Sequence, residues 1–285
     1  MTENRTIVLT YHSHHVVGSA YSENDHVALA QDLPAIKALG GRFVPLGEIV
    51  AQLTQRHAAT DDKSSARLQV AITFDDGPIY DVTPFEHPRV GRQPGFLKIL
   101  RDFRSTLPSE EQRAFRAISF VIASPSARRQ METSFDAEYT YLGNGSMADD
   151  WWLPAIDTGL FDIANHSWDH LHPALPEVRH SEQAKGDFKQ VTCEEDADGQ
   201  IAAAARLISR KTANRAQPYF AYPFGHYNSF LTDEYFPRSP SHGVEAAFTV
   251  GATPVRPDQS IWCIPRYVCG HHWREPEALA RILVG

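Results

Sequence analysis

Short apolar runs alternate with longer amphipathic stretches along most of the chain. The run at 68–74 (Leu-Gln-Val-Ala-Ile-Thr-Phe) is followed by a Gly-Pro break, which indicates a buried strand ending in a turn. In residues 26–39, Leu29, Leu33 and Ile36 share one face, which predicts a helix that ends at a Gly-Gly pair. The same criteria predict strands at 6–11, 42–46, 117–122, 160–164, 218–222, 245–250 and 261–264, and helices at 46–56, 95–106, 150–158, 195–211 and 275–283.

The order of these elements defines the fold class. Strands that alternate with helices imply an α/β protein with a mostly parallel sheet. A chain of 285 residues can form one such domain, and no linker or internal repeat divides it, so we expect a single domain over residues 1–285. Two polar stretches interrupt the alternation: 57–66 is predicted to be a loop, and 124–147, which is rich in turn formers, a surface insertion.

Composition and charge exclude several classes of partner. The formal net charge of −8 argues against a nucleic-acid partner and against an anionic membrane surface. The N-terminus lacks the pattern of a secretion signal and no segment approaches transmembrane length, so we expect a soluble, cytoplasmic protein. Cys193, Cys263 and Cys269 have no Cys-x-x-Cys spacing and are interpreted as ordinary thiols.

Candidate chemistry lies at the ends of two predicted strands. Asp75 and Asp76 directly follow the first; paired carboxylates suit a metal site or proton transfer, although Asp, Gly and Pro also form simple turns. His166 and His170 follow the run 160–164, at a spacing that puts both rings on one helix face, where they bind metal or are solvated. Together the two patterns favour one aspartate and two histidines on a metal, with the second aspartate free to act as a base.

These segments resemble the signature motifs of a known family. Residues 73–77 (Thr-Phe-Asp-Asp-Gly) match its first motif, 166–170 its His-Ser/Thr-x-x-His motif, and 220–225 its third motif in part. On these residues the chain resembles the polysaccharide deacetylase family, also called the NodB-homology or carbohydrate esterase family 4, over at least 68–270. The resemblance implies a distorted or incomplete (β/α) barrel, and such barrels place their working groups at the carboxyl ends of strands.

The resemblance also implies a role for each motif residue. Asp76, His166 and His170 would bind a divalent metal; this donor set suits zinc best, and iron, cobalt or nickel accept similar ligands. The ion would lower the pKa of a bound water and polarise the substrate carbonyl, and Asp75 would take the water's proton as general base. A backbone N–H matching Phe224 would help stabilise the oxyanion.

Two departures from the family pattern affect the catalytic groups. The third motif usually carries an arginine that pairs with the base, but Ala221 occupies that position; Arg266, at another strand end, could supply the charge or could be an ordinary structural ion pair. The usual C-terminal Leu-x-His motif of the acid is missing, whereas the first strand ends in Tyr-His at His12, as in a branch with this motif permuted to the N-terminus. His12 is therefore the preferred general acid; the alternatives are a packed, purely structural His12 and the histidines His271, His272 and His226, with His14 and His15 as weaker candidates.

Several aromatic residues on or beside the motifs are candidates for the substrate cleft. Aromatic faces stack on the apolar faces of sugar rings, but large aromatics also fill hydrophobic cores. A cleft role is favoured for Trp168, which lies between the two histidines, whereas for the other aromatics a core position is at least as good an interpretation. The predicted substrate-binding residues are Trp151, Trp168, Tyr222, Pro223 and Phe224.

The predicted function is removal of N-acetyl groups from an N-acetylated carbohydrate by a metal-dependent amide hydrolase. Two alternatives remain open at this point. An enzyme of the same fold could hydrolyse a small amide, ureide or cyclic imide, which the missing signal peptide favours. A carbohydrate- or metal-binding module without activity is the other alternative, but the intact Asp75, Asp76, His166 and His170 argue against it.

Overall fold

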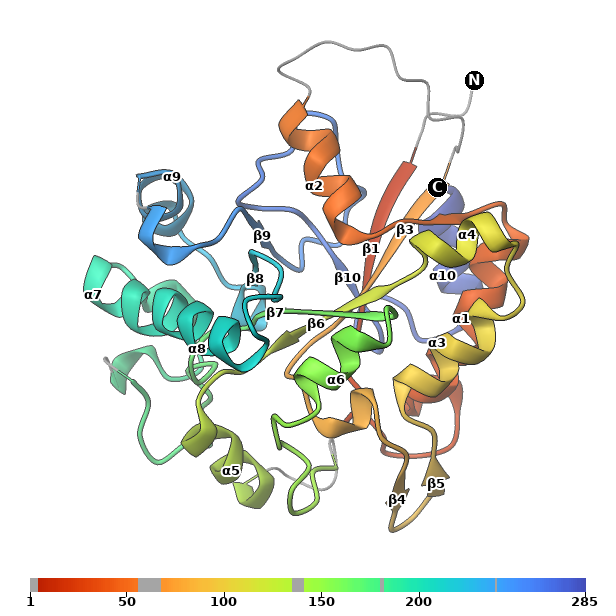
Figure 1. The fold of residues 1–285 in the computed structure, drawn as a ribbon, viewed down its shortest axis with the longest axis horizontal. Helices are drawn as coiled ribbons and strands as arrows, with labels where there is room; N and C mark the ends of the chain where they lie inside the picture. Colours follow the sequence, from red (N-terminus) through yellow and green to blue (C-terminus); the bar gives the residue numbers. More distant parts are fainter. Residues whose placement is uncertain (1–4, 56–67, 135–140, 180–181, 239) are drawn as a thin grey trace.

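A curled, eight-stranded sheet forms the centre of the protein (Figure 1). The computed structural model describes residues 5–55, 68–134, 141–179, 182–238 and 240–285. The strand order is β10-β1-β3-β6-β7-β8-β9, β2 also pairs with β3, and every pairing in this sheet is parallel. A separate antiparallel hairpin consists of β4 and β5.

The elements have the following bounds. The strands are β1 (Arg5–Tyr11), β2 (Arg42–Phe43), β3 (Leu68–Phe74), β4 (Phe85–His87), β5 (Gly91–Gln93), β6 (Ala117–Val121), β7 (Phe161–Asn165), β8 (Tyr219–Ala221), β9 (Ala246–Phe248) and β10 (Tyr267–Val268). The helices are α1 (Asp25–Ala38), α2 (Leu46–Gln55), α3 (Phe96–Arg104), α4 (Ser109–Ala114), α5 (Pro125–Ser134), α6 (Trp152–Asp157), α7 (Glu194–Ala197), α8 (Ala203–Lys211), α9 (Phe236–Arg238) and α10 (Pro276–Val284).

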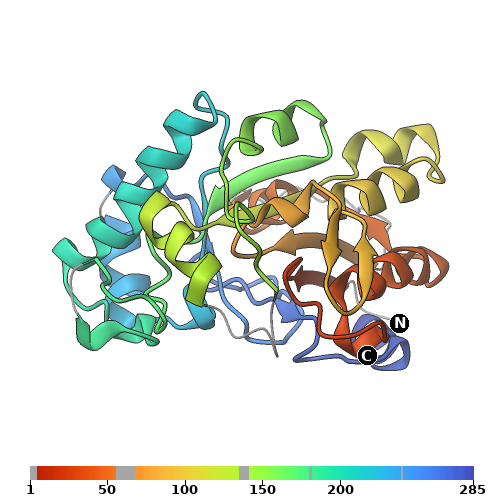
Figure 2. The same ribbon diagram turned by 90° about the horizontal axis from the view of Figure 1, so that it is seen from below.

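The last segment of the sheet connects its two edges. Ile264 forms a parallel bridge with Phe248 on β9, and β10, only a few residues later, pairs with β1. The sheet therefore curls into a distorted barrel, as the family resemblance implied. Helices surround it, and the β4–β5 hairpin and α5 lie at the lower end in Figure 1; Figure 2, seen from below, shows both in front of the strands.

Strands of the barrel are buried on both faces, which explains their continuous apolar sequences. Ile7 and Leu9 on β1 pack outward with α1, α3 and α10, whereas Val8 belongs to the inner cluster. Val8 pairs in register with Ala71 on β3, which is also in the inner cluster, and its neighbour Val70 packs outward. Because side chains alternate with a period of two, neighbouring residues on β1 and β3 fall into opposite clusters.

Most predicted elements are confirmed, and three differ. Residues 125–134 form helix α5 within the stretch predicted as a surface insertion, because Ala127 and Met131 bury one side of it. The predicted strand at 261–264 is reduced to the single bridge at Ile264. The predicted helix at 195–211 contains a π-helical turn at Asp198–Ala202. The predicted loop at 57–66 lies outside the described residues.

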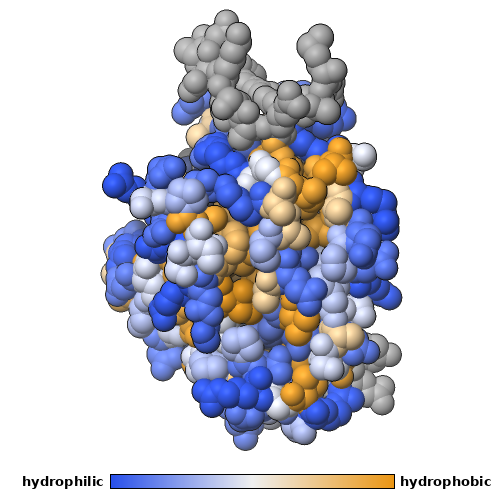
Figure 3. Space-filling model, turned by 90° about the vertical axis from the view of Figure 1, so that its right-hand side faces the viewer, coloured by the Kyte–Doolittle hydropathy of each residue, from blue (hydrophilic) through white to orange (hydrophobic). Residues whose placement is uncertain are grey.

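The outer surface near α1, α3 and α10 is mostly hydrophilic, with smaller hydrophobic patches (Figure 3). Leu39, which follows α1, is 43% exposed, and Val284 at the end of α10 is 61% exposed. No helix within the described ranges combines the length and apolar character needed to cross a bilayer.

Candidate active site

The inner rows of side chains continue beyond the barrel core into a cavity at the carboxyl ends of the strands. On β3, Thr73 is followed two residues later by Asp75, and on β7 the inner Ala164 is followed by His166. On β1, counting in steps of two from the inner Val8 leads to His12, which therefore continues the inner row. Asp75, His166 and His12 all line one cavity of about 360 Å³. The period of the strands thus brings together residues from three separate segments.

Asp76 leaves this alternation through a tight turn. Its backbone has φ 73° and that of Gly77 has φ 70°, both in the left-handed region that disfavours side chains. The turn swings the Asp76 carboxylate toward the histidines: Oδ1 lies 3.6 Å from Nε2 of His166 and 3.7 Å from Nε2 of His170. The strained conformation at Asp76 therefore directs its carboxylate to both histidines, whereas Asp75 pairs with Arg266 and shares only His166, whose Nε2 lies 3.9 Å from Oδ2 of Asp75.

Gly77→Ala is expected to lower the free energy of unfolding by about 1–3 kcal/mol, since it adds a clash to an unfavourable φ. An added Cβ would lie 2.5 Å from Cγ1 of Val121. Gly40→Ala is a matched control, because Gly40 has φ +79° and an added Cβ would meet no heavy atom of the described residues within 4 Å. Urea unfolding of both variants measures the difference; equal losses would contradict a steric role for Gly77.

The loop that carries the two histidines is held by hydrogen bonds from side chains to its backbone. Ser167 N–H donates to Asn165 Oδ1 (2.8 Å), His170 N–H to Ser167 Oγ (2.9 Å) and Leu171 N–H to Asp169 Oδ1 (2.9 Å). Ser167, His170 and Leu171 have positive φ values of 74°, 63° and 46°. Such conformations persist only where surrounding contacts enforce them, and they concentrate at functional sites.

The orientation of His166 leaves its Nε2 available as a metal ligand. Its Nδ1 lies 2.9 Å from the carbonyl oxygen of Ala221, and since a carbonyl only accepts, Nδ1 must carry the proton. Nε2 then presents its lone pair toward Asp76. A backbone carbonyl on the second imidazole nitrogen is a common way to orient a metal-binding histidine. Ala221, where the family pattern has arginine, thus contributes through its backbone.

Asp76, His166 and His170 together fit a divalent metal. One ligand atom from each lies within 4.8 Å of the other two, and both histidines are buried. Burial lowers the pKa of His170 to about 3 despite the nearby Asp76, so its imidazole is neutral. Burial alone would raise the pKa of Asp76, but the surrounding histidines outweigh it and hold that pKa well below the ordinary value. A carboxylate and neutral imidazoles are the states that metal binding requires.

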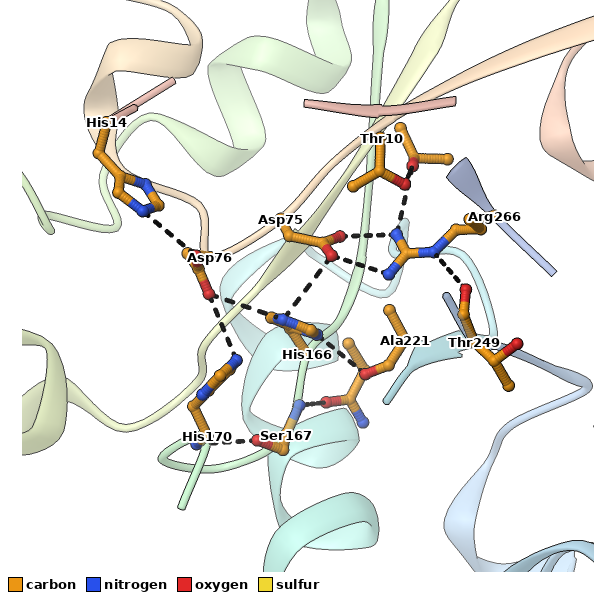
Figure 4. Close-up of polar contacts among 12 residues, drawn as sticks. Thr10, His14, Asp75, Asp76, His166, Ser167, His170, Ala221, Thr249 and Arg266 are labelled. Carbon is orange, nitrogen blue, oxygen red and sulfur yellow. Dashed lines mark hydrogen bonds and ion pairs between the residues drawn. The ribbon is translucent and has the colours of Figure 1, made fainter. Parts of the chain in front are cut away.

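Asp75 forms a buried, bidentate ion pair with Arg266, as Figure 4 shows. Both guanidinium–carboxylate distances are 2.7 Å, and the Arg266 side chain is 0% exposed. Arg266 also donates to the hydroxyl of Thr73 and to the carbonyl of Thr249. Burial alone would raise the pKa of Asp75, but the charge of Arg266, aided by His166, lowers it below the ordinary value. Asp75 is therefore ionised and held in one orientation.

The predicted acid candidates differ in their placement. His12 and His271 line the cavity. His226 lies 3.0 Å from Asp187 and His272 accepts a hydrogen bond from the Val268 N–H; neither is among the described cavity-lining residues. His15 lies 2.7 Å from Asp25 outside the cavity.

The predicted substrate-binding aromatics also divide into two groups. Tyr222 and Phe224 line the cavity, and the ring of Phe224 lies 4.4 Å from that of His170, held by the tight turn that begins at Pro223. Trp151 is instead buried in the core, where it packs against Phe161. Trp168 faces away from the cavity and borders a separate hollow of about 240 Å³ beneath the guanidinium of Arg179. Trp151 thus takes the core position that the sequence had left open for it, whereas Trp168 differs from the expected cleft role: it follows the left-handed turn at Ser167 and packs beneath Arg179.

Sequence reasoning missed several residues that build the site. Asp25 accepts the backbone N–H of His12 (2.7 Å), and Asp81 accepts from Ser13 Oγ and Ser119 Oγ, both at 2.6 Å. Burial raises the pKa of Asp81 to about 7. No motif marks either aspartate, because their partners are distant in sequence. The apolar cavity wall was also missed; it includes Ile122 at the end of a predicted strand, and Met131, Leu142 and Met147 from the stretch predicted as a surface insertion.

A distorted (β/α) barrel with a carboxylate–imidazole cluster at the carboxyl ends of its strands is the class that fold and site define. The family model described as polysaccharide deacetylase matches residues 62–235, and the chain belongs to this family of hydrolases that act on carbon–nitrogen bonds. The matched stretch contains Asp75, Asp76, His166 and His170, but not His12 or Arg266. No protein of curated function matches the chain in sequence.

Solved structures of deacetylases share the fold. The Streptococcus pyogenes deacetylase PplD in complex with acetate has a TM-score of 0.60 at 15% identity, covering 99% of each chain. A de-N-acetylase from Aggregatibacter actinomycetemcomitans has a TM-score of 0.61 at 16% identity, covering 98% of this chain and 100% of that one. IcaB from Ammonifex degensii has a TM-score of 0.60 at 20% identity, covering 97% and 96%. At these identities the likeness concerns the fold.

Proposed function

We propose that the protein is a metal-dependent amide hydrolase that removes N-acetyl groups from an N-acetylated carbohydrate. The observation that carries this proposal is the convergence of Asp76, His166 and His170 in a cavity beside the ionised Asp75. Family membership supports hydrolysis of an N-acetyl group on a sugar. A similar structure described as a deacetylase in complex with acetate contains the acid that such a reaction would release.

In this proposal the two adjacent aspartates have different roles. Asp76, His166 and His170 would hold a divalent ion, most suitably zinc although iron, cobalt or nickel accept similar donors. Such an ion would supply Lewis acidity toward the amide carbonyl and toward a nearby water. Asp75 removes the proton from the attacking water as general base. Arg266 keeps Asp75 ionised and oriented through both of its oxygens.

The remaining steps need an oxyanion donor and an acid. We assign the backbone N–H of Phe224 to the oxyanion, because this residue borders the cavity in a strained turn with φ 57°. His12 is assigned as the general acid that protonates the leaving amine, since it lies at the end of the inner row of β1 and lines the cavity. Phe224, which is 37% exposed, is the aromatic group placed to contact the sugar, whereas Tyr222 is fully buried behind the cavity wall.

Acetate release from N-acetylated chitooligosaccharides tests this proposal. Protein purified without chelator is expected to contain about one divalent ion per chain, because the three ligands define one open site. Removing the ion by chelation and dialysis should abolish acetate release, and adding zinc, cobalt, nickel or ferrous iron should restore it. Elemental analysis and an acetate assay measure the two quantities.

A parallel assay separates deacetylation from the other amide hydrolyses that the same site chemistry permits. Ammonia release from small cyclic imides and ureides is measured with the same metal-loaded protein. Activity on those compounds without acetate release from any N-acetylated sugar would contradict the proposed substrate. Acetate release that continues fully in metal-free protein would contradict the proposed chemistry.

A further inference from the structure

We propose that His14 is a positioning residue that orients the metal-binding carboxylate of Asp76 by donating a hydrogen bond to its second oxygen. The inference rests on the proposed metal site, and no motif or spacing assigned this role to His14. In the structure Nε2 of His14 lies 3.6 Å from Oδ2 of Asp76 (Figure 4). His14 would support the site without binding the ion, because its imidazole faces one metal-binding residue, Asp76, and does not join the three ligand atoms.

The two oxygens of Asp76 face different partners. Oδ1 faces His166 and His170, at 3.6 Å and 3.7 Å, and Oδ2 faces His14. A separation of 3.6 Å is longer than a hydrogen bond. The terminal torsion of an aspartate is soft, however, so a small rotation of the carboxylate closes this gap. An ion bound at Oδ1 and a hydrogen bond from His14 to Oδ2 would then hold the Asp76 carboxylate in the same orientation.

The backbone around His14 is held firmly enough for this role. The carbonyl of His14 accepts hydrogen bonds from the N–H groups of Val16 (2.9 Å) and Tyr141 (3.0 Å). The preceding Ser13 donates to the buried Asp81 at 2.6 Å. These contacts hold the backbone that carries His14, and its side chain is only 7% exposed. A ligating carboxylate held in this way binds its ion more tightly, since less freedom is lost on binding.

Two other roles for His14 fit the geometry less well. His14 is not well placed as a fourth ligand to the same ion. The ligand atoms of Asp76, His166 and His170 lie within 4.8 Å of one another, and His14 is outside that group. The general acid must face the reacting amide, whereas Nε2 of His14 faces the far oxygen of Asp76. His12, whose ring centre lies 5.6 Å from that of His14, remains the assigned acid.

Zinc affinity of the full-length, metal-free protein tests the inference without using turnover. His14→Leu is expected to weaken zinc binding by about 10–100-fold, the usual cost of losing a partner of a ligand. His14→Gln can donate from a similar position and should recover part of this loss. His271→Gln is the matched control, because His271 lines the same cavity but lies outside the group of Asp76, His166 and His170. Isothermal titration with zinc chloride gives affinity and stoichiometry for each variant.

Three results would overturn the inference. Unchanged zinc affinity in His14→Leu would remove His14 from support of the ion. Equal weakening in the Leu and Gln variants would mean that His14 acts by packing alone. Two zinc ions per chain in the wild type, falling to one in His14→Leu, would make His14 a ligand of a second ion.

Failure of folding is distinguished from loss of the hydrogen bond by circular dichroism of each metal-free variant. If His14→Leu does not fold, His14→Asn replaces it, because the shorter amide cannot reach Oδ2. The zinc measurement is also independent of substrate. A protein that releases no acetate but loses zinc affinity in His14→Leu would refute the proposed function and support this inference. A protein that releases acetate but keeps its zinc affinity in His14→Leu would support the proposed function and refute this inference.

Discussion

Asp75→Asn is expected to lower the turnover number for acetate release by about 10²–10⁴-fold, the usual contribution of a general base. The amide keeps the shape of the carboxylate but cannot accept the proton of the attacking water. Metal content should stay at the wild-type level, because the ion is assigned to Asp76, His166 and His170. Steady-state kinetics and elemental analysis of the purified variant measure the two effects.

Asp162→Asn provides the matched control for this substitution. Asp162 lies on β7 and pairs with Arg116 at 3.6 Å, away from the cavity. Its variant should retain wild-type turnover. An Asp75→Asn protein that keeps both full activity and its metal would remove Asp75 as the base. Loss of the metal along with activity would instead place Asp75 among the ligands.

Arg266→Met is expected to lower the free energy of unfolding by about 3–5 kcal/mol at neutral pH, the range observed when one partner of a buried ion pair is removed. The variant leaves the Asp75 carboxylate buried without its main cation, since the Arg266 side chain is 0% exposed and meets both oxygens at 2.7 Å. Chemical unfolding measures the loss. Arg256→Met is the control: it breaks an exposed pair with Asp258, and exposed pairs contribute at most about 1 kcal/mol.

The same substitution should alter the pH dependence of activity and stability. The pKa of Asp75 is lowered in the folded protein, so this group stabilises the fold above its unfolded pKa of about 4, and that contribution is lost as pH falls through the lower folded pKa. Without Arg266 the folded pKa rises, and the acidic limb of the pH–rate profile moves to higher pH. An unchanged profile together with wild-type stability would mean that Arg266 does not tune Asp75.

Much of the site could be predicted from sequence because its central residues follow strands. Asp75 and His166 each continue the inner row of a parallel strand, and the period of two places both in the same cavity. The motif at 73–77 also contains its own turn, since Gly77 is needed at φ 70° against Val121. Local sequence therefore determines the conformation as well as the chemistry of this segment.

Arg266 shows where sequence reasoning reached its limit. The chain contains several arginines at predicted strand ends, and Arg266 lies 191 residues from Asp75. Its pairing depends on closure of the barrel, where the segment after β9 crosses from Phe248 to β1. From the sequence, Arg266 was equally well interpreted as the partner of the base and as part of an ordinary structural ion pair. The bidentate geometry favours the pairing that tunes the base.

The side chains of Trp168 and of the stretch 124–147 depend on tertiary contacts for a related reason. Trp168 lies between two cavity histidines in sequence, but the left-handed backbone at Ser167 turns its side chain toward Arg179. The stretch 124–147 is polar on average, yet Met131 and Met147 from it form part of the cavity wall. Average polarity cannot reveal which few side chains a folded loop turns inward.

The sequence by itself determined the family, the alternation of strands and helices, and the candidate ligands Asp76, His166 and His170, since these depend on neighbouring residues and on strand period. Only the tertiary structure decided which distant groups support them: Arg266 on Asp75, the Ala221 carbonyl on His166, and His14 beside Asp76. These contacts join segments that become neighbours only when the sheet curls. The physical reason is that periodicity acts along one strand, whereas the partners of a buried charge are chosen by packing in three dimensions.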